Sequence, residues 1–401
     1  MISVAEARAR ITSALIPVST EIVSVAQAAG RVLAEDVHAA MTQPPAAVSA
    51  MDGYAVRAAD LEALPASLTV VGAAPAGGAF AGTLGSGQAV RIFTGAPMPQ
   101  GPDTVLMQED CTLEGTAVTV PPGIKRGANR RRAGEDVEAG TTILAAGRRL
   151  RAQDIGLAAS VGQATLSVHR ALRVALLSTG DEIREVSEAL PPGCVYDANR
   201  YVIAGLLDGL GCAVDDLGIL PDRLDSVHAA LADAARGHDL IMTSGGVSTG
   251  EEDHVRAAVE AQGKIHFWRL AIRPGRPLAL GQVGRVPFIG LPGNPVAVMV
   301  TFMRFARPAI LRLAGAADSP PRLFPVRAAF GYRKKVSRRE WLRVSLFTDE
   351  DGSLAVRKFP RDGAGILSSM VAADGLVELP EALGELVPGS MVDFLPFSEV
   401  S

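Results

Sequence analysis

From about residue 171 to residue 318, short apolar runs alternate with segments whose apolar residues recur at helical spacing. Residues 172–177 are apolar except for Arg173, which is typical of a strand buried on both faces of a sheet. The next segment has an apolar face at Val202, Leu206 and Leu210, with Asn199 as its expected N-cap. Further strands are expected near 213–220, 240–243 and 286–291, and helices near 224–235, 252–261 and 295–313. This alternation predicts a doubly wound α/β domain with a parallel sheet.

The rest of the chain has a different pattern. Residues 1–40 and 141–170 contain segments of helical spacing, whereas residues 41–140 place short β-rich runs between many Gly and Pro residues. After about residue 319, short alternating runs indicate strands. We therefore predict four parts: a linking domain of 1–40 with 141–170, an inserted β module over 41–140, the α/β domain over 171–318 and a small C-terminal β-barrel-like domain over 319–401.

Composition excludes several classes of protein. The chain has 39 basic and 43 acidic residues and only 4% aromatic residues, which gives neither the charge nor the stacking surface of a nucleic-acid-binding protein. Its three cysteines are far apart and odd in number, so no disulfide framework is expected. No uncharged apolar run approaches the roughly 18 residues of a membrane span. We expect a cytoplasmic protein that binds neither nucleic acid nor membrane.

Small, hydroxyl-bearing or acidic residues follow each predicted strand of the α/β domain. The first strand leads into Thr179, Gly180 and Glu182, and the strand over 213–220 leads into Asp222. Because the carboxyl ends of parallel strands meet at one edge of a sheet, we expect these residues to converge there with the later loops. Those loops contribute Ser244, Gly245, Gly246, Ser248, Asp253, Arg273, Arg276, Pro292, Gly293, Asn294 and Pro295. Each loop alone could be an ordinary turn or cap, but their shared placement favours a ligand site.

The residue types at this edge favour a phosphorylated ligand. Gly245 and Gly246 would allow backbone N–H groups to approach an anion, and Arg273 and Arg276 supply fixed positive charge. Three acidic side chains at the same edge would repel phosphate unless a divalent cation lay between them: Glu182, Asp222 and Asp253. The sequence therefore implies that Mg²⁺ bridges the protein and a phosphate or nucleotide-like ligand.

The β module offers further polar candidates. Asp52 stands next to Gly53, Thr94 stands next to a turn, and Asp136 follows the basic run 130–132. Asp52 could equally satisfy the backbone of its own turn, and the basic run could be a solvated loop. Spacing alone does not decide between these interpretations.

Eight short motifs occur in a fixed order along nearly the whole chain. They are Ser-Ala-Met-Asp-Gly-Tyr-Ala at 49–55, Phe-Thr-Gly-Ala at 93–96, Gly-Glu-Asp at 134–136, Ser-Thr-Gly-Asp-Glu at 178–182, Tyr-Asp-Ala-Asn at 196–199, Ser-Gly-Gly-Val-Ser at 244–248, Pro-Gly-Arg-Pro at 274–277 and Leu-Pro-Gly-Asn-Pro at 291–295. In this set and order the chain resembles the molybdopterin molybdenumtransferase family, which includes the E domain of gephyrin.

The resemblance implies an activity and an assembly. Family members insert molybdenum from molybdate into adenylylated molybdopterin, release AMP and leave the molybdenum cofactor. They form elongated homodimers in which each active site is shared between the β module of one subunit and the α/β and C-terminal domains of the other. The adenylyltransferase that makes the substrate is a candidate partner.

The resemblance also implies which residues form the site. The catalytic positions are Asp52, Thr94, Asp136, Glu182, Asp222 and Asp253; the substrate-binding positions are Thr179, Gly180, Ser244, Gly245, Gly246, Ser248, Arg273, Arg276, Pro292, Gly293, Asn294 and Pro295. Glu182 and Asp253 are expected to hold Mg²⁺ on the phosphoanhydride, whereas Asp52 and Asp136 belong to the molybdate side and Asp222 to either group. Some of these carboxylates are expected to act as acids, kept protonated by mutual repulsion.

The sequence departs from the common family pattern at a few positions. The family often has Lys at the positions of Arg273 and Arg276, so charge is kept but the planar guanidinium changes the geometry offered to an anion. Two other functions are compatible with parts of the chain. One is molybdopterin adenylyltransferase, which shares the α/β domain but would not need the β module with Asp52 and Asp136. The other is a non-enzymatic scaffold of the same fold, which could lose its carboxylates freely.

Overall fold

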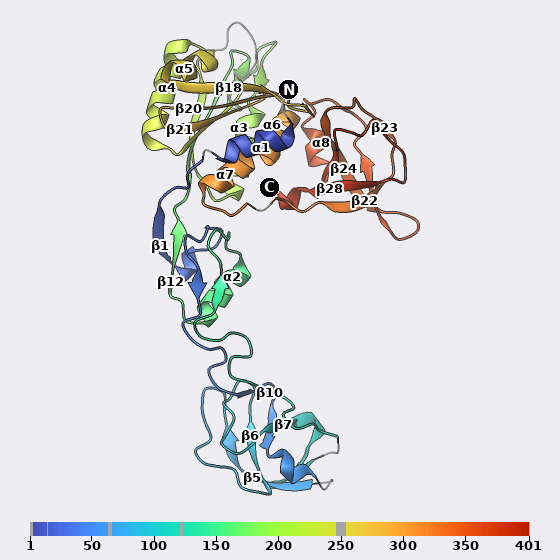
Figure 1. Cartoon of the computed structure of the whole chain (residues 1–401). Coiled ribbons are helices and arrows are strands. Elements are labelled where there is room, and N and C mark those ends of the chain that lie inside the picture. The colour runs from blue at the N-terminus through green and yellow to red at the C-terminus, as the bar shows by residue number, and fades with distance from the viewer. Residues whose placement is uncertain are drawn as a thin grey trace.

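The chain is elongated, with four structural parts arranged along it (Figure 1). The computed structural model describes residues 3–13, 15–62, 66–120, 123–245, 254–318 and 320–400. An α/β part and a C-terminal β part lie side by side at one end, a small linking region lies in the middle, and the β module lies at the far end. The multidomain architecture predicted from the sequence is therefore confirmed, while its exact domain boundaries stay a prediction.

The α/β part is built on a six-stranded sheet in the order β16-β13-β17-β21-β20-β18. The first four of these strands are parallel: β16 (Ala213–Leu220), β13 (Arg173–Thr179), β17 (Leu240–Ser244) and β21 (Val286–Leu291). The sequence pattern predicts a wholly parallel sheet, but the remaining edge is antiparallel: β20 (Pro277–Val283) and β18 (Gly263–Arg269). The connections from β18 to β20 and from β20 to β21 are too short to hold a crossover helix, which parallel pairing requires.

Helices cover both faces of this sheet. They are α3 (Ala198–Gly209), α4 (Leu224–Gly237), α5 (His254–Gln262), α6 (Pro295–Thr301) and α7 (Arg307–Leu313). The predicted single helix over 295–313 is interrupted by a π-helical segment, Phe302–Ala306. Pro308 has no N–H to donate to the preceding turn, and a π segment before it accommodates the missing bond.

One detail of the predicted helices is wrong. Asn199 lies inside α3, and the N-cap is Asp197, whose Oδ1 accepts from the Arg200 N–H at 3.1 Å. The first helix, α1 (Val4–Ser13), packs against the α/β part: Val4 and Ala7 are buried in the same core as α3, α6 and α7. It contacts α7 and the π-helical segment.

The linking region joins segments from both sides of the β module. β1 (Thr20–Ser24) pairs antiparallel with β12 (Thr165–His169), and β2 (Val37–His38) pairs with β11 (Thr142–Leu144). The helix α2 (Ala152–Ser160) packs on these strands over a small apolar core that includes Leu33 and Leu150.

The β module holds a six-stranded sheet in the order β7-β4-β6-β5-β9-β8. Its strands are β4 (Gly53–Val56), β5 (Ala66–Ala74), β6 (Gln88–Ile92), β7 (Thr104–Met107), β8 (Thr112–Glu114) and β9 (Ala117–Val120). A short pair, β3 (Val48–Ser49) and β10 (Arg130–Arg131), closes the module where the chain enters and leaves it.

The C-terminal part is a closed barrel. Its strands run in the order β24-β25-β22-β28-β26, and β26 pairs back with β24. Their bounds are β22 (Phe324–Ala328), β24 (Arg339–Thr348), β25 (Leu354–Lys358), β26 (Gly375–Leu379) and β28 (Met391–Pro396). Short elements decorate it: β23 (Tyr332–Arg333), β27 (Glu385–Leu386) and α8 (Ser368–Val371). The predicted barrel-like domain is thus confirmed.

One strand crosses between the α/β part and the barrel. β19 (Ile272–Arg273) pairs in parallel with β24, so that Ile272 is opposite Arg339 and Arg273 is opposite Glu340. A backbone ladder therefore fixes the Arg273 loop against the barrel, and the groups on both sides of this seam face one space.

Candidate active site

A cavity of about 710 Å³ lies at the seam between the α/β part and the barrel. Seven of the predicted site residues line it: Glu182, Gly245, Arg273, Arg276, Pro292, Gly293 and Asn294. They come from four separate loops at the carboxyl ends of the strands, as the sheet-edge argument predicts. Their individual roles stay predictions.

Other predicted residues lie behind the cavity wall. Thr179 and Ser244 are buried at the ends of β13 and β17, which pair side by side. Gly245 has a φ of +84°, and a Cβ there would lie 3.2 Å from the Thr179 carbonyl oxygen. This position therefore favours glycine, and its N–H donates to the Leu291 carbonyl at 3.2 Å. Gly180 also has positive φ, +147°.

Not every predicted residue can be placed in the cavity. Asp222 follows β16 by two residues and is half-buried at the same edge of the sheet, and Pro295 begins α6. Gly246, Ser248 and Asp253 lie outside the described residues. No group of three or more His, Cys, Asp or Glu side chains that could hold a metal ion is found among the described residues.

The β-module candidates are far from the cavity of their own chain (Figure 1). Asp52 precedes β4 and Thr94 follows β6, and Asp52 Oδ1 accepts hydrogen bonds from both the backbone N–H and the hydroxyl of Thr94, each at 2.7 Å. These bonds from Thr94 hold the pKa of Asp52 below its ordinary value. Asp52 is therefore ionised at neutral pH and, in the single chain, is no proton donor. Asp136 is exposed beyond β10.

The barrel contributes charged residues that the sequence reasoning missed. Arg343 lines the cavity although its residue is only 5% exposed. Its Nε donates to the Ser369 hydroxyl at 3.0 Å and its Nη2 to the Arg361 carbonyl at 2.8 Å. Burial lowers the pKa of Arg343, and no carboxylate of the described residues is in ion-pair contact with it. The available signal was a charged side chain between the apolar residues Leu342 and Val344 of a predicted strand.

A hydrogen-bonded cluster also joins the barrel to the predicted arginine loop. Arg273 Nη1 donates to the Tyr332 hydroxyl at 3.1 Å, and this hydroxyl donates to Glu340 Oε2 at 2.9 Å. Glu340 is fully buried and also accepts from Arg338 at 2.6 Å. Burial and the contact with Glu340 raise the pKa of Tyr332 to about 12, so Tyr332 stays protonated and can keep donating.

The cavity is suited to binding oxyanions. Arg273, Arg276 and Arg343 place three guanidinium groups on its wall, and Arg276 has no ion-pair partner in the described part of the chain. Planar guanidinium groups bind phosphate-like oxygens through paired hydrogen bonds. Glu182 is exposed on the same wall and pairs with no described basic side chain, which leaves its oxygens available to a cation or a proton.

The fold and the cavity define a class of protein: a multidomain chain in which an α/β domain and a barrel share a cavity suited to oxyanions, with a β module at the far end. Three family models match the chain in succession: "MoeA N-terminal region (domain I and II)" over residues 2–162, "Probable molybdopterin binding domain" over 175–312 and "MoeA C-terminal region (domain IV)" over 325–397. The chain belongs to the molybdopterin molybdenumtransferase family and is a transferase.

Relatives of known name cover most or all of the chain. The molybdopterin molybdenumtransferase of Haemophilus influenzae is 38% identical over 404 residues and covers 100% of both chains. A protein of the same name from Nostoc sp. is 40% identical over 306 residues, 74% of this chain and 70% of its own. A match that includes the β module and the barrel does not favour the adenylyltransferase interpretation, which needs the α/β domain alone.

Solved structures show the same fold over the whole length. The molybdopterin biosynthesis moea protein from Pyrococcus horikosii superimposes with a TM-score of 0.77 and 30% identity, covering 99% of each chain. A second structure of the protein from Pyrococcus horikoshii gives a TM-score of 0.81 at 27% identity. Among the described helices, none is long and apolar enough to cross a membrane.

Proposed function

We propose that this chain inserts molybdenum from molybdate into adenylylated molybdopterin and releases AMP, in the cytoplasm. The main support for the proposal is the cavity that is lined by three arginines from two domains and by the exposed Glu182. Both substrates are oxyanions: one carries a phosphoanhydride, and the other is a tetrahedral dianion. A cavity with three guanidinium groups can hold the oxygens of both at once.

In this reaction two sulfur atoms of the pterin replace oxygen atoms at molybdenum, and the released oxygens leave as water after protonation. Water also adds to the phosphoanhydride, and AMP departs. Arg273, Arg276 and Arg343 bind and orient the oxyanions, and they stabilise the charge on the departing phosphate.

The donor groups at the cavity fit Mg²⁺. This ion is usually held by one or two carboxylates together with phosphate oxygens and water, rather than by a complete protein cage. Glu182 is an exposed carboxylate on a wall that also holds three arginines, which agrees with that pattern. Asp362, the other exposed carboxylate that lines the cavity, is paired with Lys358. Glu182 and Asp253 would hold the ion, which when bound polarises the phosphoanhydride.

The distance between the two halves of the predicted site supports a shared active site. Within one chain, Asp52, Thr94 and Asp136 are at the opposite end of the molecule from the cavity (Figure 1). A two-fold dimer would bring the β module of one chain to the cavity of the other, and would hold two equivalent sites. The exposed Asp136 and the rigidly bonded Asp52–Thr94 pair would then be the partner's contribution.

The test is to incubate the purified protein with adenylylated molybdopterin, Mg²⁺ and molybdate, and to measure AMP. Tungstate in place of molybdate tests the choice of oxyanion. Arg276→Gln should lower AMP release by about tenfold or more, because it removes a charge-assisted contact to the oxyanion. Arg285→Gln is the matched control, since this exposed arginine lies beyond the other end of β20. Absence of AMP release with either oxyanion would overturn the proposal.

A further inference from the structure

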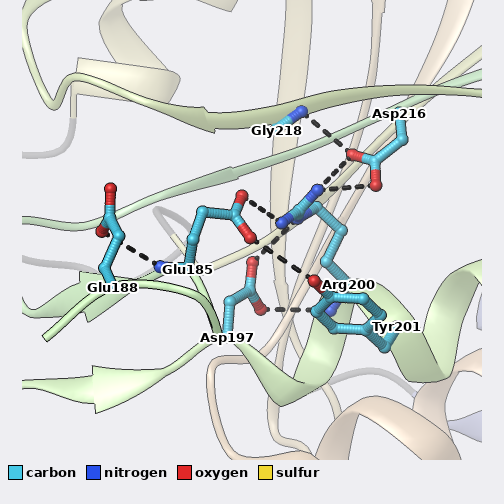
Figure 2. A network of polar contacts seen from close by, with 7 residues as sticks. All are labelled: Glu185, Glu188, Asp197, Arg200, Tyr201, Asp216 and Gly218. Carbon is cyan, nitrogen blue, oxygen red and sulfur yellow. Dashed lines mark hydrogen bonds and ion pairs between the residues drawn. The ribbon is translucent and has the colours of Figure 1, made fainter. Parts of the chain in front are cut away.

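A buried arginine, Arg200, bonds to three separate segments of the α/β part (Figure 2). The Arg200 side chain is only 6% exposed and pairs with Glu185, Asp197 and Asp216. Its Nη1 lies 2.6 Å from both carboxylate oxygens of Asp216, and its Nε lies 3.2 Å from Asp197 Oδ2. One guanidinium group therefore bonds to carboxylates from three different parts of the fold.

The three carboxylates belong to different elements. Asp216 lies on β16, Asp197 is the N-cap of α3, and Glu185 lies in the loop of residues 180–197 that joins β13 to α3. Burial alone would lower the pKa of Arg200, but its pairing with Asp216 and Asp197 raises it above the ordinary value. The Arg200 guanidinium therefore stays charged over the physiological pH range, and its three ion pairs persist.

The 180–197 loop carries Glu182 to the cavity. Its two ends form a short parallel ladder, β14 (Ile183–Arg184) with β15 (Val195–Tyr196). The Val195 N–H donates to the Glu182 carbonyl at 2.9 Å, and the Asp197 N–H donates to the Arg184 carbonyl at 3.0 Å. Two backbone hydrogen bonds therefore hold the segment that contains Glu182. The ion pair between Arg200 and Glu185 fixes this segment to α3.

The first turn of α3 also contacts a second loop that lines the cavity. The Asn199 side chain, next to Arg200 in α3, donates from Nδ2 to the Gly293 carbonyl at 2.7 Å. Gly293 belongs to the loop that follows β21 and lines the cavity. The first turn of α3 therefore sets the position of both the Glu182 loop and the Gly293 loop.

We propose that Arg200 is a positioning residue for the reaction: through its ion pair with Glu185 it holds Glu182 at the cavity. The inference rests on the proposed function of Glu182 as a metal ligand. The competing explanation is that Arg200 contributes only to the stability of the fold. The two explanations differ in what they predict for Glu185 and Asp216, which bind the same guanidinium group from different elements.

The experiment compares Glu185→Ala with Asp216→Ala as its matched control. Neither change strips Arg200 of all its partners, whereas removing Arg200 would leave the buried Asp197 unpaired and the protein at risk of misfolding. Glu185→Ala should lower AMP release about tenfold at limiting Mg²⁺, the usual effect of losing a group that orients a metal ligand. Asp216→Ala should stay within about twofold, and Glu185→Gln should recover part of the loss.

Hydrogen exchange gives a readout that does not depend on activity. The Val195 amide should exchange about tenfold faster in Glu185→Ala, because the β14–β15 pairing that contains it is no longer fixed by the ion pair with Arg200. In Asp216→Ala its rate should match wild type. Unchanged exchange at Val195 in Glu185→Ala, or equal effects of both substitutions, would overturn the positioning role and leave a purely structural one.

A double substitution tests whether Glu185 acts through Glu182. In a Glu182→Gln background, Glu185→Ala should cause no further loss of AMP release, because the positioned group is already gone. A full additional loss would overturn the proposal. If Glu182→Gln alone is fully active, the proposed metal role of Glu182 fails, and the exchange rate of Val195 still decides whether Arg200 orders the loop.

Discussion

Arg273 Nη1 lies 3.1 Å from the Tyr332 hydroxyl oxygen, a contact between the α/β part and the barrel. The same hydroxyl donates a hydrogen bond to the buried Glu340. The position of the Arg273 guanidinium is therefore set by the barrel as well as by its own loop. The C-terminal domain therefore contributes directly to the proposed anion-binding site.

Tyr332→Phe should raise the KM for the oxyanion substrate about threefold to tenfold with a smaller change in kcat, because Arg273 loses one fixed partner. The cost in stability should be about 1 kcal/mol, since Glu340 keeps its bond from Arg338. Steady-state kinetics and thermal unfolding measure the two effects. Tyr196→Phe is the control, because its hydroxyl donates to the Glu188 carbonyl in an exposed loop. Equal KM values in both variants would contradict the assigned role of Tyr332.

Arg343→Gln should weaken oxyanion binding by about tenfold or more, because it removes a buried positive charge that has no carboxylate partner among the described residues. The fold should survive, since the amide can still bond to Ser369. Binding titration with molybdate or tungstate measures the effect. Arg357→Gln, an exposed arginine on the neighbouring strand β25 that stacks on Phe347, serves as control. Unaltered affinity in Arg343→Gln would remove the barrel arginine from the site.

Thr94→Val tests the pKa of Asp52. The bonds from the Thr94 backbone and hydroxyl lower the Asp52 pKa, so Asp52 is ionised at every pH above that lowered value, and the bonds weaken as pH falls through it. Removing the hydroxyl leaves the backbone donor, so the pKa should rise part of the way to its ordinary value. A carbon-detected NMR titration of the Asp52 carboxyl group measures this. Thr119→Val, exposed on β9, should leave the titration unchanged; a shift of the same size there would point to a non-specific cause.

Much of the site could be predicted from the sequence because most of its residues follow parallel strands of one sheet. Strands β13, β17 and β21 are apolar runs, and the residues that follow parallel strands meet at one edge. That rule brings Glu182, Gly245, Arg273 and Gly293 to the same cavity without any knowledge of the rest of the chain. The rule fails for residues whose position depends on how two domains meet.

Arg343 and Tyr332 illustrate that failure. Both lie in the barrel, and nothing in the spacing of their strands indicates that they face the α/β part across the β19–β24 pairing. The capping error at α3 has a different cause. Asp197 and Asn199 are both good N-cap residues, and only the structure shows that Asp197 reaches the Arg200 N–H while Asn199 reaches Gly293.

The last prediction tests whether the active site is shared between subunits. Asp52→Ala and Glu182→Ala homodimers should each be inactive, because every site of either dimer lacks one carboxylate. In a mixed dimer with a shared site, one active site collects both substitutions and the other collects neither. The two variants are co-expressed with different tags, and the mixed dimer is isolated by sequential affinity steps. It should regain about half of the wild-type AMP release per dimer, since one of its two sites is intact.

The alternative, an active site formed within a single chain, predicts a different activity for the mixed dimer. If a site used Asp52 and Glu182 of the same chain, every site of the mixed dimer would carry one substitution and no activity would return. That outcome would require the β module to fold back over its own cavity, against the extended arrangement of the chain (Figure 1). Asp103→Ala paired with Glu182→Ala is the control, because Asp103 lies in the same module but bonds only within it, to Ala58, Thr104 and Arg126. The Asp103→Ala homodimer should itself be active, and its mixed dimer with Glu182→Ala should show about half of wild-type activity in either arrangement. This control therefore gives the activity expected of one intact site, against which the Asp52→Ala mixed dimer is compared.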